Sequence, residues 1–320
     1  MTSRASAGHT AWTQTPERSN MLMLRIMTWI SLRLGRRAGR ALLHPIAAYF
    51  LCFAPASRRA SATYLTRVLG RTPRWRERYR HFFTFAATVH DRLYLVNRRF
   101  DLFDFEVHGE DKLHQLLAGG KGVFLMGAHL GSFEAIRALG RNGPYPRIAM
   151  VMHEENAKKI NAMLAAINPE AVQDVIGLGH ADSMLKVWDH LEQGAAIGIL
   201  ADRTAHDDIL CPVQILGASA NLPRGPFRMA AMLQRPLLFM TGLYLGGNRY
   251  AIHFDPIADF STVERAGRTG RAERDAAVEA AITRYAALLD QYCRAAPYNW
   301  FNFFDFWQPA PAPGPGPQPL

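Results

Sequence analysis

From about residue 102 onward, short apolar runs alternate with amphipathic segments. Most of the runs have the length of a buried strand, roughly four to eight residues, and the segments between them carry the three-to-four-residue spacing of a helix. Strands are predicted at 103–108, 123–126, 147–152, 172–178, 195–200, 210–216, 236–245 and 249–254. Helices are predicted at 111–117, in the stretch that follows 131, and at 156–167, 181–193, 226–234 and 271–294. This alternation predicts an α/β fold with a largely parallel central sheet flanked by helices.

The first hundred residues have a different pattern. Residues 1–20 are polar without periodicity, and we expect a disordered leader. The runs 21–34 and 41–56 are apolar, but arginines interrupt the first, and His44 and Pro45 interrupt the second. Neither supplies the ~18 to 20 uninterrupted apolar residues of a spanning helix. The pattern is typical of helices at a membrane interface, although two buried helices packed on the globular domain, or one tilted span, would fit it too.

Charge is concentrated in the same region. Residues 1–100 contain 18 Arg and three acids, a balance of +15, whereas the remaining 220 residues hold 19 basic and 24 acidic residues, a balance of −5. Residues 58–100 continue as a predicted basic amphipathic helix. So uneven a charge calls for an anionic partner, either an acidic membrane surface or nucleic acid. Because no nucleic-acid-reading motif is present, we expect no nucleic-acid partner.

The amino-acid composition adds little to the predicted fold, but it excludes some classes of protein. Apolar residues make up 49% and charged residues 20%, which is typical of a globular protein. Three widely spaced cysteines predict neither a disulfide framework nor a metal site, and they fit a reducing compartment. We therefore expect a leader (1–20), a helical membrane-associated region (21–100), an α/β domain (101–307) and a Pro/Gly-rich tail (308–320) that forms no core.

The strongest candidate for chemistry lies in residues 122–140. The buried run 123–126 leads through His129 and Gly131 into a helical pattern that carries Glu134. A turn between a strand and a helix lies at the carboxyl edge of the sheet, where α/β proteins bind ligands. His129 is a candidate general base, and Glu134 is its candidate orienting partner if Ser132 caps the helix. A turn histidine beside an unrelated glutamate remains the alternative.

Two further segments offer binding groups. Asp202 and Arg203 end another predicted strand, where Asp202 could orient a substrate and Arg203 could hold a phosphate or carboxylate; a local ion pair or helix cap is the alternative. Arg224 stands at a predicted helix start that could bind an anion, or that could simply close a tight loop. The cluster of His206, Asp207 and Asp208 has no second set of metal ligands, so no metal is predicted.

Other motifs are informative by what they exclude. The chain has no Gly-x-Ser-x-Gly elbow, phosphate-binding Gly-rich loop with Lys, or dinucleotide fingerprint between a predicted strand and helix. This disfavours a serine hydrolase, an NTPase and a dehydrogenase. The aromatic run 299–307 is expected to bury itself against the domain, with contact to an acyl chain or lipid as the alternative.

Residues 127–134, Gly-Ala-His-Leu-Gly-Ser-Phe-Glu, resemble the His-x4-Glu/Asp motif of the bacterial lipid A biosynthesis acyltransferases, a family within the lysophospholipid acyltransferase group. The resemblance extends from about residue 24 to 307. Residues 199–203 are similar to the family's strand that ends in a functional Asp, 221–230 to its Gly-containing helix start, and 299–307 to its aromatic ending.

The resemblance implies direct acyl transfer from a thioester of acyl-carrier protein or coenzyme A to a hydroxyl of a lipid A-like or other glycolipid acceptor. His129 would take the hydroxyl proton and Glu134 would stabilise the imidazolium. Asp202, Arg203 and Arg224 would bind substrate. No cofactor or metal is required, and the expected location is the cytoplasmic face of a bacterial inner membrane. A glycerol-based lysophospholipid acyltransferase and a catalytically silent lipid-binding scaffold are the alternatives.

Overall fold

The computed structural model describes residues 21–142, 148–168, 175–179, 181–203, 208–262 and 267–307, so the predicted leader and tail lie outside it. Within these residues, nine strands form two sheets. They are β1 (Asp104–His108), β2 (Val123–Gly127), β3 (Ile148–His153), β4 (Val175–Leu178), β5 (Ala196–Leu200), β6 (Leu210–Ile215), β7 (Ala218–Pro223), β8 (Pro236–Gly246) and β9 (Arg249–Asp259).

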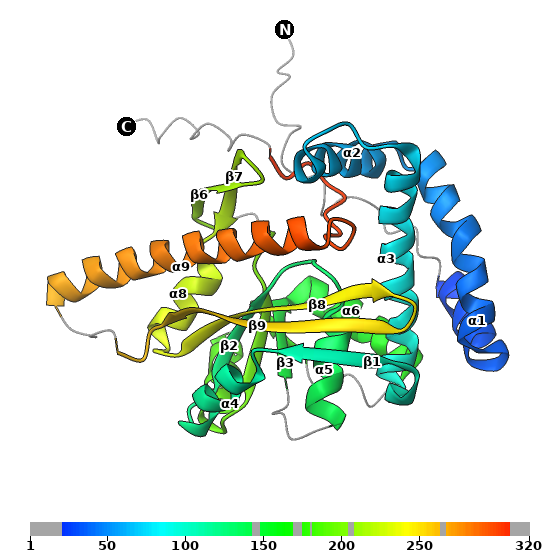
Figure 1. Cartoon of the computed structure of the whole chain (residues 1–320). Coiled ribbons are helices and arrows are strands. Elements are labelled where there is room, and N and C mark those ends of the chain that lie inside the picture. Colours follow the sequence, from blue (N-terminus) through cyan, green and yellow to red (C-terminus); the bar gives the residue numbers. More distant parts are fainter. Residues whose placement is uncertain are drawn as a thin grey trace, which may run out of the picture.

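The larger sheet has seven strands in the order β1-β9-β8-β2-β5-β3-β4 (Figure 1). All neighbours pair in parallel except β8 and β9, which form an antiparallel hairpin. This confirms the mixed α/β fold with a mostly parallel central sheet. The second sheet is the antiparallel hairpin β6–β7. Strand β7 was not predicted, because Pro223 and the following Arg-Gly-Pro indicated a helix start, and the alternation before it rests on the small side chains of Ala218 and Ala220.

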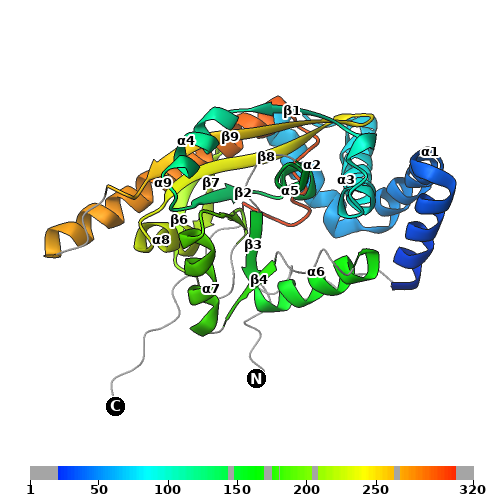
Figure 2. The ribbon, with the colours of Figure 1, turned by 90° about the horizontal axis from the view of Figure 1, so that it is seen from below.

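Helices cover both faces of the sheet. They are α4 (Glu110–Ala118), α5 (Phe133–Asn142), α6 (Glu154–Ile167), α7 (Ala181–Glu192), α8 (Gly225–Met232) and α9 (Gly267–Ala295). Figures 1 and 2 show α9 and α5 on opposite sides of the central strands.

Two cores result from the alternation of side chains along each strand. In β2, Phe124 and Met126 point into a core shared with α8 and α9, whereas Val123 and Leu125 point into a core shared with α5. Burial on both faces explains why the central strands are continuous apolar runs rather than alternating ones.

Three helices precede the sheet: α1 (Met21–Phe53), α2 (Pro55–Leu69) and α3 (Trp75–Val96). The two predicted apolar runs both lie in α1, whose backbone leaves the helical conformation between them at Gly35 (φ 84°, ψ 169°), so that α1 consists of two helical segments joined at a kink. The predicted helix over 58–100 is two helices, because Gly70 (φ 67°) ends α2 in the left-handed conformation. Among the described residues, no helix combines the length and apolar character that crossing a membrane requires.

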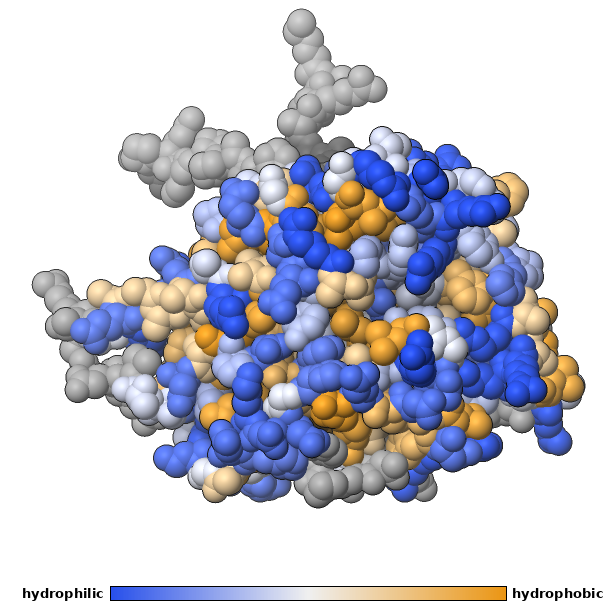
Figure 3. Space-filling model, in the orientation of Figure 1, coloured by the Kyte–Doolittle hydropathy of each residue, from blue (hydrophilic) through white to orange (hydrophobic). Residues whose placement is uncertain are grey.

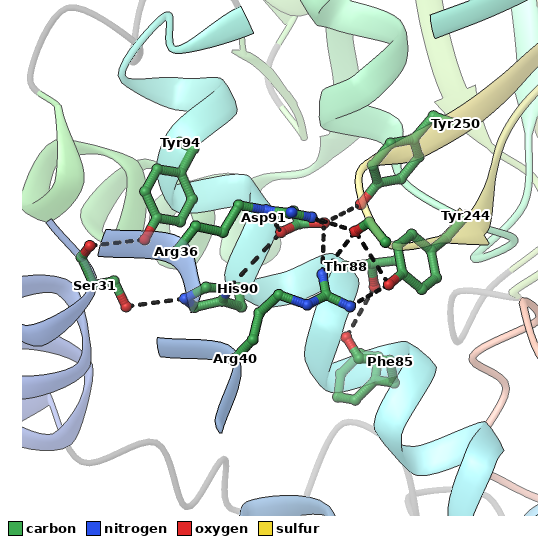
Figure 4. A network of polar contacts seen from close by, with 11 residues as sticks. Ser31, Arg36, Arg40, Phe85, Thr88, His90, Asp91, Tyr94, Tyr244 and Tyr250 are labelled. Atoms are coloured by element: carbon green, nitrogen blue, oxygen red, sulfur yellow. Dashed lines mark hydrogen bonds and ion pairs between the residues drawn. The ribbon is translucent and has the colours of Figure 1, made fainter. Parts of the chain in front are cut away.

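A buried carboxylate anchors α1 to the rest of the protein (Figure 4). Asp91 of α3 accepts two hydrogen bonds from the Arg36 guanidinium, at 2.8 and 2.9 Å, and a third from the Tyr250 hydroxyl of β9 at 2.9 Å. Arg36 and Arg40 also donate to the carbonyl of Gly247, at the tip of the β8–β9 hairpin. The same charges therefore hold α1, α3 and the hairpin together.

Candidate active site

The turn between β2 and α5 places His129 at the carboxyl edge of the sheet. Its shape depends on Gly131, whose φ is 75° and whose backbone lies so close to β8 that a Cβ would approach the Gly242 carbonyl oxygen to 2.1 Å. Only glycine accommodates both constraints. Ser132 caps α5, as predicted, by accepting a hydrogen bond from the Ala135 amide at 3.3 Å.

His129 is hydrogen-bonded to Asp202, which follows β5. The Nδ1 atom lies 2.8 Å from Oδ1 of Asp202, and the His129 amide donates to Oδ2 at 3.0 Å. Because an ionised carboxylate only accepts hydrogen bonds, Nδ1 carries the ring proton and Nε2 keeps its lone pair. The imidazole is 30% exposed while the carboxylate is fully buried. This is the arrangement of a general base with an orienting acid.

The electrostatics of the pair favour a neutral imidazole. Burial and the nearby Arg203 guanidinium lower the pKa of His129, and the opposing effect of Asp202 is smaller. Burial alone would raise the pKa of Asp202, but the imidazole, its hydrogen bond, Arg203 and an indole N–H together lower it to about 2. At neutral pH the site therefore holds an ionised carboxylate and an imidazole able to accept a proton.

Glu134, predicted to orient His129, has a different partner. Its two carboxylate oxygens accept hydrogen bonds from Nη1 of Arg137, at 3.2 and 3.3 Å, and both side chains are buried in the same helix. One turn of α5 separates the two residues, which is the spacing of an intrahelical ion pair. The contact predicted for Glu134 is therefore made by Asp202, a residue predicted to bind substrate, and the catalytic role of Glu134 stays a prediction.

Arg203 lies beside the His129–Asp202 pair. Its guanidinium stacks over the ring of Phe304 at 5.3 Å and donates to the Phe301 carbonyl at 3.3 Å, while its buried Nε has no hydrogen-bond partner among the described residues. Three of the residues selected from the sequence, His129, Asp202 and Arg203, are thus brought together.

Arg224 makes its ion pairs elsewhere. It contacts Glu279 and Asp275 of α9, at 3.3 and 3.9 Å. The first amide of α8, that of Gly225, donates to Asp208 at 3.1 Å. The predicted anion site is thus occupied by carboxylates of the protein itself. His206 and Asp207 lie outside the described residues.

The C-terminal segment completes the site in a way that the sequence did not predict. Trp300 forms an antiparallel bridge with Leu130, flanked by hydrogen bonds from the Phe301 amide to the His129 carbonyl (2.7 Å) and from the Gly131 amide to the Asn299 carbonyl (2.8 Å). The Trp300 indole donates to Oδ2 of Asp202 at 2.9 Å. The expected burial of the aromatic run is confirmed for Trp300, Phe301 and Phe306, whereas Phe303, Phe304 and Trp307 are half-buried. The requirement of a buried indole for an acceptor was the available signal.

Amides of the turn are largely engaged within the protein. Besides those of His129 and Gly131, the Ser132 amide donates to the Gly242 carbonyl at 2.8 Å. These three groups are therefore committed to holding the turn, and a developing oxyanion would need other donors.

Comparison with known sequences agrees with this geometry. The sequence profile described as "Bacterial lipid A biosynthesis acyltransferase" matches residues 13–308, nearly the whole chain. The chain belongs to this family. It is therefore an acyltransferase, and the family to which it belongs acts in lipid biosynthesis.

Other comparisons are weaker. Among curated proteins, no sequence matches the chain. Among solved structures, the chain is similar to the 1-acyl-sn-glycerophosphate acyltransferase PlsC from Thermotoga maritima, with 14% identity, a TM-score of 0.33, and coverage of 81% of this chain and 92% of that one. So low a TM-score carries no argument about the site.

Proposed function

We propose that this acyltransferase moves a fatty acyl group from a thioester, of acyl-carrier protein or coenzyme A, to a hydroxyl of a lipid A-like or other glycolipid acceptor. The observation that carries the proposal is the His129–Asp202 pair at the carboxyl edge of the sheet, with Nδ1 protonated and Nε2 free to accept a proton.

In the proposed reaction, Nε2 of His129 removes the proton of the acceptor hydroxyl as its oxygen attacks the thioester carbonyl. The C–O bond forms, the C–S bond breaks, and the imidazolium returns the proton to the departing thiolate. Asp202 stabilises the imidazolium in between, because its ionised carboxylate is bonded to Nδ1. Arg203 is proposed to face the phosphorylated part of donor or acceptor, since its guanidinium lies beside the pair.

We also propose that α1–α3 rest on the cytoplasmic face of a bacterial inner membrane. The support is the balance of +15 over residues 1–100 together with exposed aromatic side chains on these helices, among them Trp29, Tyr49, Phe50, Phe53 and Trp75. Hydrophobic and charged residues lie interspersed over this part of the surface (Figure 3). Arginines beside large apolar side chains fit the interface of an anionic bilayer.

The test is an acyl-transfer assay with both thioester donors, coupled to mass spectrometry of bacterial lipids made with and without an active copy. We expect a new acylated glycolipid. His129→Ala should reduce kcat by ~10²-fold or more with the fold retained, and Asp202→Asn should reduce kcat per folded molecule by a similar factor. Acylation of a glycerol-based lysophospholipid alone would replace the proposed acceptor. Wild-type activity in His129→Ala would refute the mechanism.

A further inference from the structure

The carboxylate that orients His129 is itself held by an indole. Oδ1 of Asp202 accepts from the imidazole Nδ1, whereas Oδ2 accepts from both the His129 amide and Nε1 of Trp300. The imidazole is thus oriented by a carboxylate whose second oxygen is fixed by a residue 98 positions further along the chain.

Trp300 has little freedom of its own. Its side chain is fully buried, and the rings of Tyr64, Phe306 and Trp307 stand edge-on to it at 5.2, 4.9 and 5.9 Å. Its carbonyl accepts a hydrogen bond from Nε2 of the buried His81 at 2.8 Å. These contacts fix the backbone, the ring and the N–H of Trp300, so the N–H donor is held in one orientation.

We propose that Trp300 is a positioning residue for acyl transfer: its indole N–H holds the Asp202 carboxylate in the rotamer that keeps Nε2 of His129 directed at the acceptor hydroxyl. This inference rests on the proposed function of His129 and Asp202. In the proposal, Trp300 contacts neither the acyl donor nor the acyl acceptor, because its N–H donates a hydrogen bond to Asp202.

The hydrogen bond has a second, electrostatic effect. An N–H donor disperses the negative charge of a carboxylate, so Asp202 without the indole is more basic and stabilises the imidazolium more strongly. Other charged or titratable groups face the pair: Arg203 and Arg92 act on His129, while Tyr285 and Cys293 of α9 lie near Asp202. None of them changes in a Trp300 variant. Loss of the indole N–H should therefore shift the acid limb of the pH–rate profile to higher pH.

The experiment compares Trp300→Phe with a matched control, Trp307→Phe. Trp307→Phe keeps an aromatic ring beside Trp300, and the N–H that it removes donates to the Ile215 carbonyl at 3.2 Å rather than to Asp202. For Trp300→Phe we expect kcat to fall by about 10-fold, KM to stay within about twofold, and the acid limb to move upward. For Trp307→Phe we expect the wild-type acid limb and nearly wild-type kcat.

Two further measurements keep the test independent of folding. Replacement of Trp300 by 3-benzothienylalanine exchanges the N–H for sulfur in a ring of the same shape, and should reproduce the Trp300→Phe kinetics with thermal unfolding unchanged. In an Asp202→Ala background, Trp300→Phe should cost little more activity, because its target is gone.

Equal kcat and acid limbs in the Trp300→Phe and Trp307→Phe variants, with His129→Ala inactive, would overturn the role of Trp300 and leave the proposed function standing. Full activity of His129→Ala would instead refute the proposed function and, with it, this inference.

Discussion

At the scale of single residues, the site is built from atoms that are distant in sequence. His129 and Asp202 are 73 positions apart, and their hydrogen bond forms because β2 and β5 are parallel neighbours whose carboxyl ends coincide. Glu134 is only five positions away, yet α5 carries it toward Arg137. Neighbouring strands of the sheet, rather than proximity along the chain, select the partner of the base.

The buried pair of Glu134 and Arg137 leads to a prediction about stability. Glu134→Gln removes the negative charge from this buried ion pair while the Arg137 guanidinium stays, and we expect the free energy of unfolding to drop by about 3 kcal/mol. Adding Arg137→Met should recover most of this loss. Denaturant unfolding of both single variants and the double variant measures it.

The same double variant tests whether Glu134 is catalytic. If Glu134 acts only through Arg137, the kcat per folded molecule should stay within about fivefold of wild type. A fall of ~10²-fold, like that expected of His129→Ala, would instead support the catalytic role that the sequence motif predicts for Glu134.

The composition of the site was only partly predictable. His129, Asp202 and Arg203 could be selected because each follows a buried run that ends at one edge of a parallel sheet. The pairing among them could not, since strand order is not written in local patterns: β5 lies beside β2, although β3 and β4 come between them in sequence. A buried Trp300 could be expected to need an acceptor, but the identity of that acceptor could not be predicted, because the contact depends on the bridge between Leu130 and Trp300.

At the scale of elements, most strands and helices followed from periodicity, and the exceptions have local causes. Gly70 and Pro73 divide the predicted helix over 58–100 into α2 and α3, because Gly70 takes a left-handed conformation and proline provides no amide donor. Arginines on both sides of this break preserve the same amphipathic pattern, so composition alone did not reveal it.

The ion pairs and hydrogen bonds of Asp91 are predicted to hold α1 against α3 and the β8–β9 hairpin. Asp91→Asn leaves Arg36 and Arg40 without their carboxylate, and we expect unfolding to become easier by about 3 kcal/mol. Trypsin should cleave α1 faster at these arginines. The matched variant Asp101→Asn removes an exposed partner of Arg99 and should leave the free energy of unfolding nearly unchanged. Equal effects of the two substitutions would contradict an anchoring role.

His81 of α3 predicts a dependence of stability on pH. It is fully buried, donating from Nε2 to the Trp300 carbonyl and accepting at Nδ1 from Ser61 Oγ at 2.9 Å. Burial lowers the pKa of His81 from 6.5 to about 4, although the Trp300 hydrogen bond opposes this. Between those values the unfolded chain binds more protons than the folded one, so stability is complete above pH 6.5 and is lost as pH falls toward 4.

The expected contribution is about 3 kcal/mol over that range. Chemical denaturation of the wild type and of His81→Gln at several pH values isolates the contribution of His81, because all other groups titrate in both proteins. The wild type should lose more stability between pH 7 and 4 than the variant does. Parallel curves for the two proteins would show that His81 does not contribute.

At the scale of the whole molecule, charge and exposed aromatics gather on the N-terminal helices, whereas the α/β domain is slightly acidic. This predicts oriented binding to anionic vesicles. Phe53, 65% exposed on α1, is expected to insert its ring, so Phe53→Ser should weaken binding to phosphatidylglycerol vesicles by about 10-fold.

The matched control is Leu185→Ser, since Leu185 is 63% exposed but lies on α7 of the α/β domain. Its vesicle affinity should equal that of wild type in a co-sedimentation assay, and neutral phosphatidylcholine vesicles should bind all three proteins weakly. A similar loss for both substitutions would mean that binding is not confined to the N-terminal helices.

The bridge between Leu130 and Trp300 has a consequence for biosynthesis. The turn that carries His129 leaves the ribosome long before residues 299–301, which supply its last backbone hydrogen bonds and the indole donor for Asp202. During translation, β2 and α5 can form, but the base and its carboxylate are not fully held in place until residues 299–301 have been synthesised. The site therefore matures in a fixed order: the strand and the turn form first, and the turn receives its last hydrogen bonds only after β9 and α9 have been made.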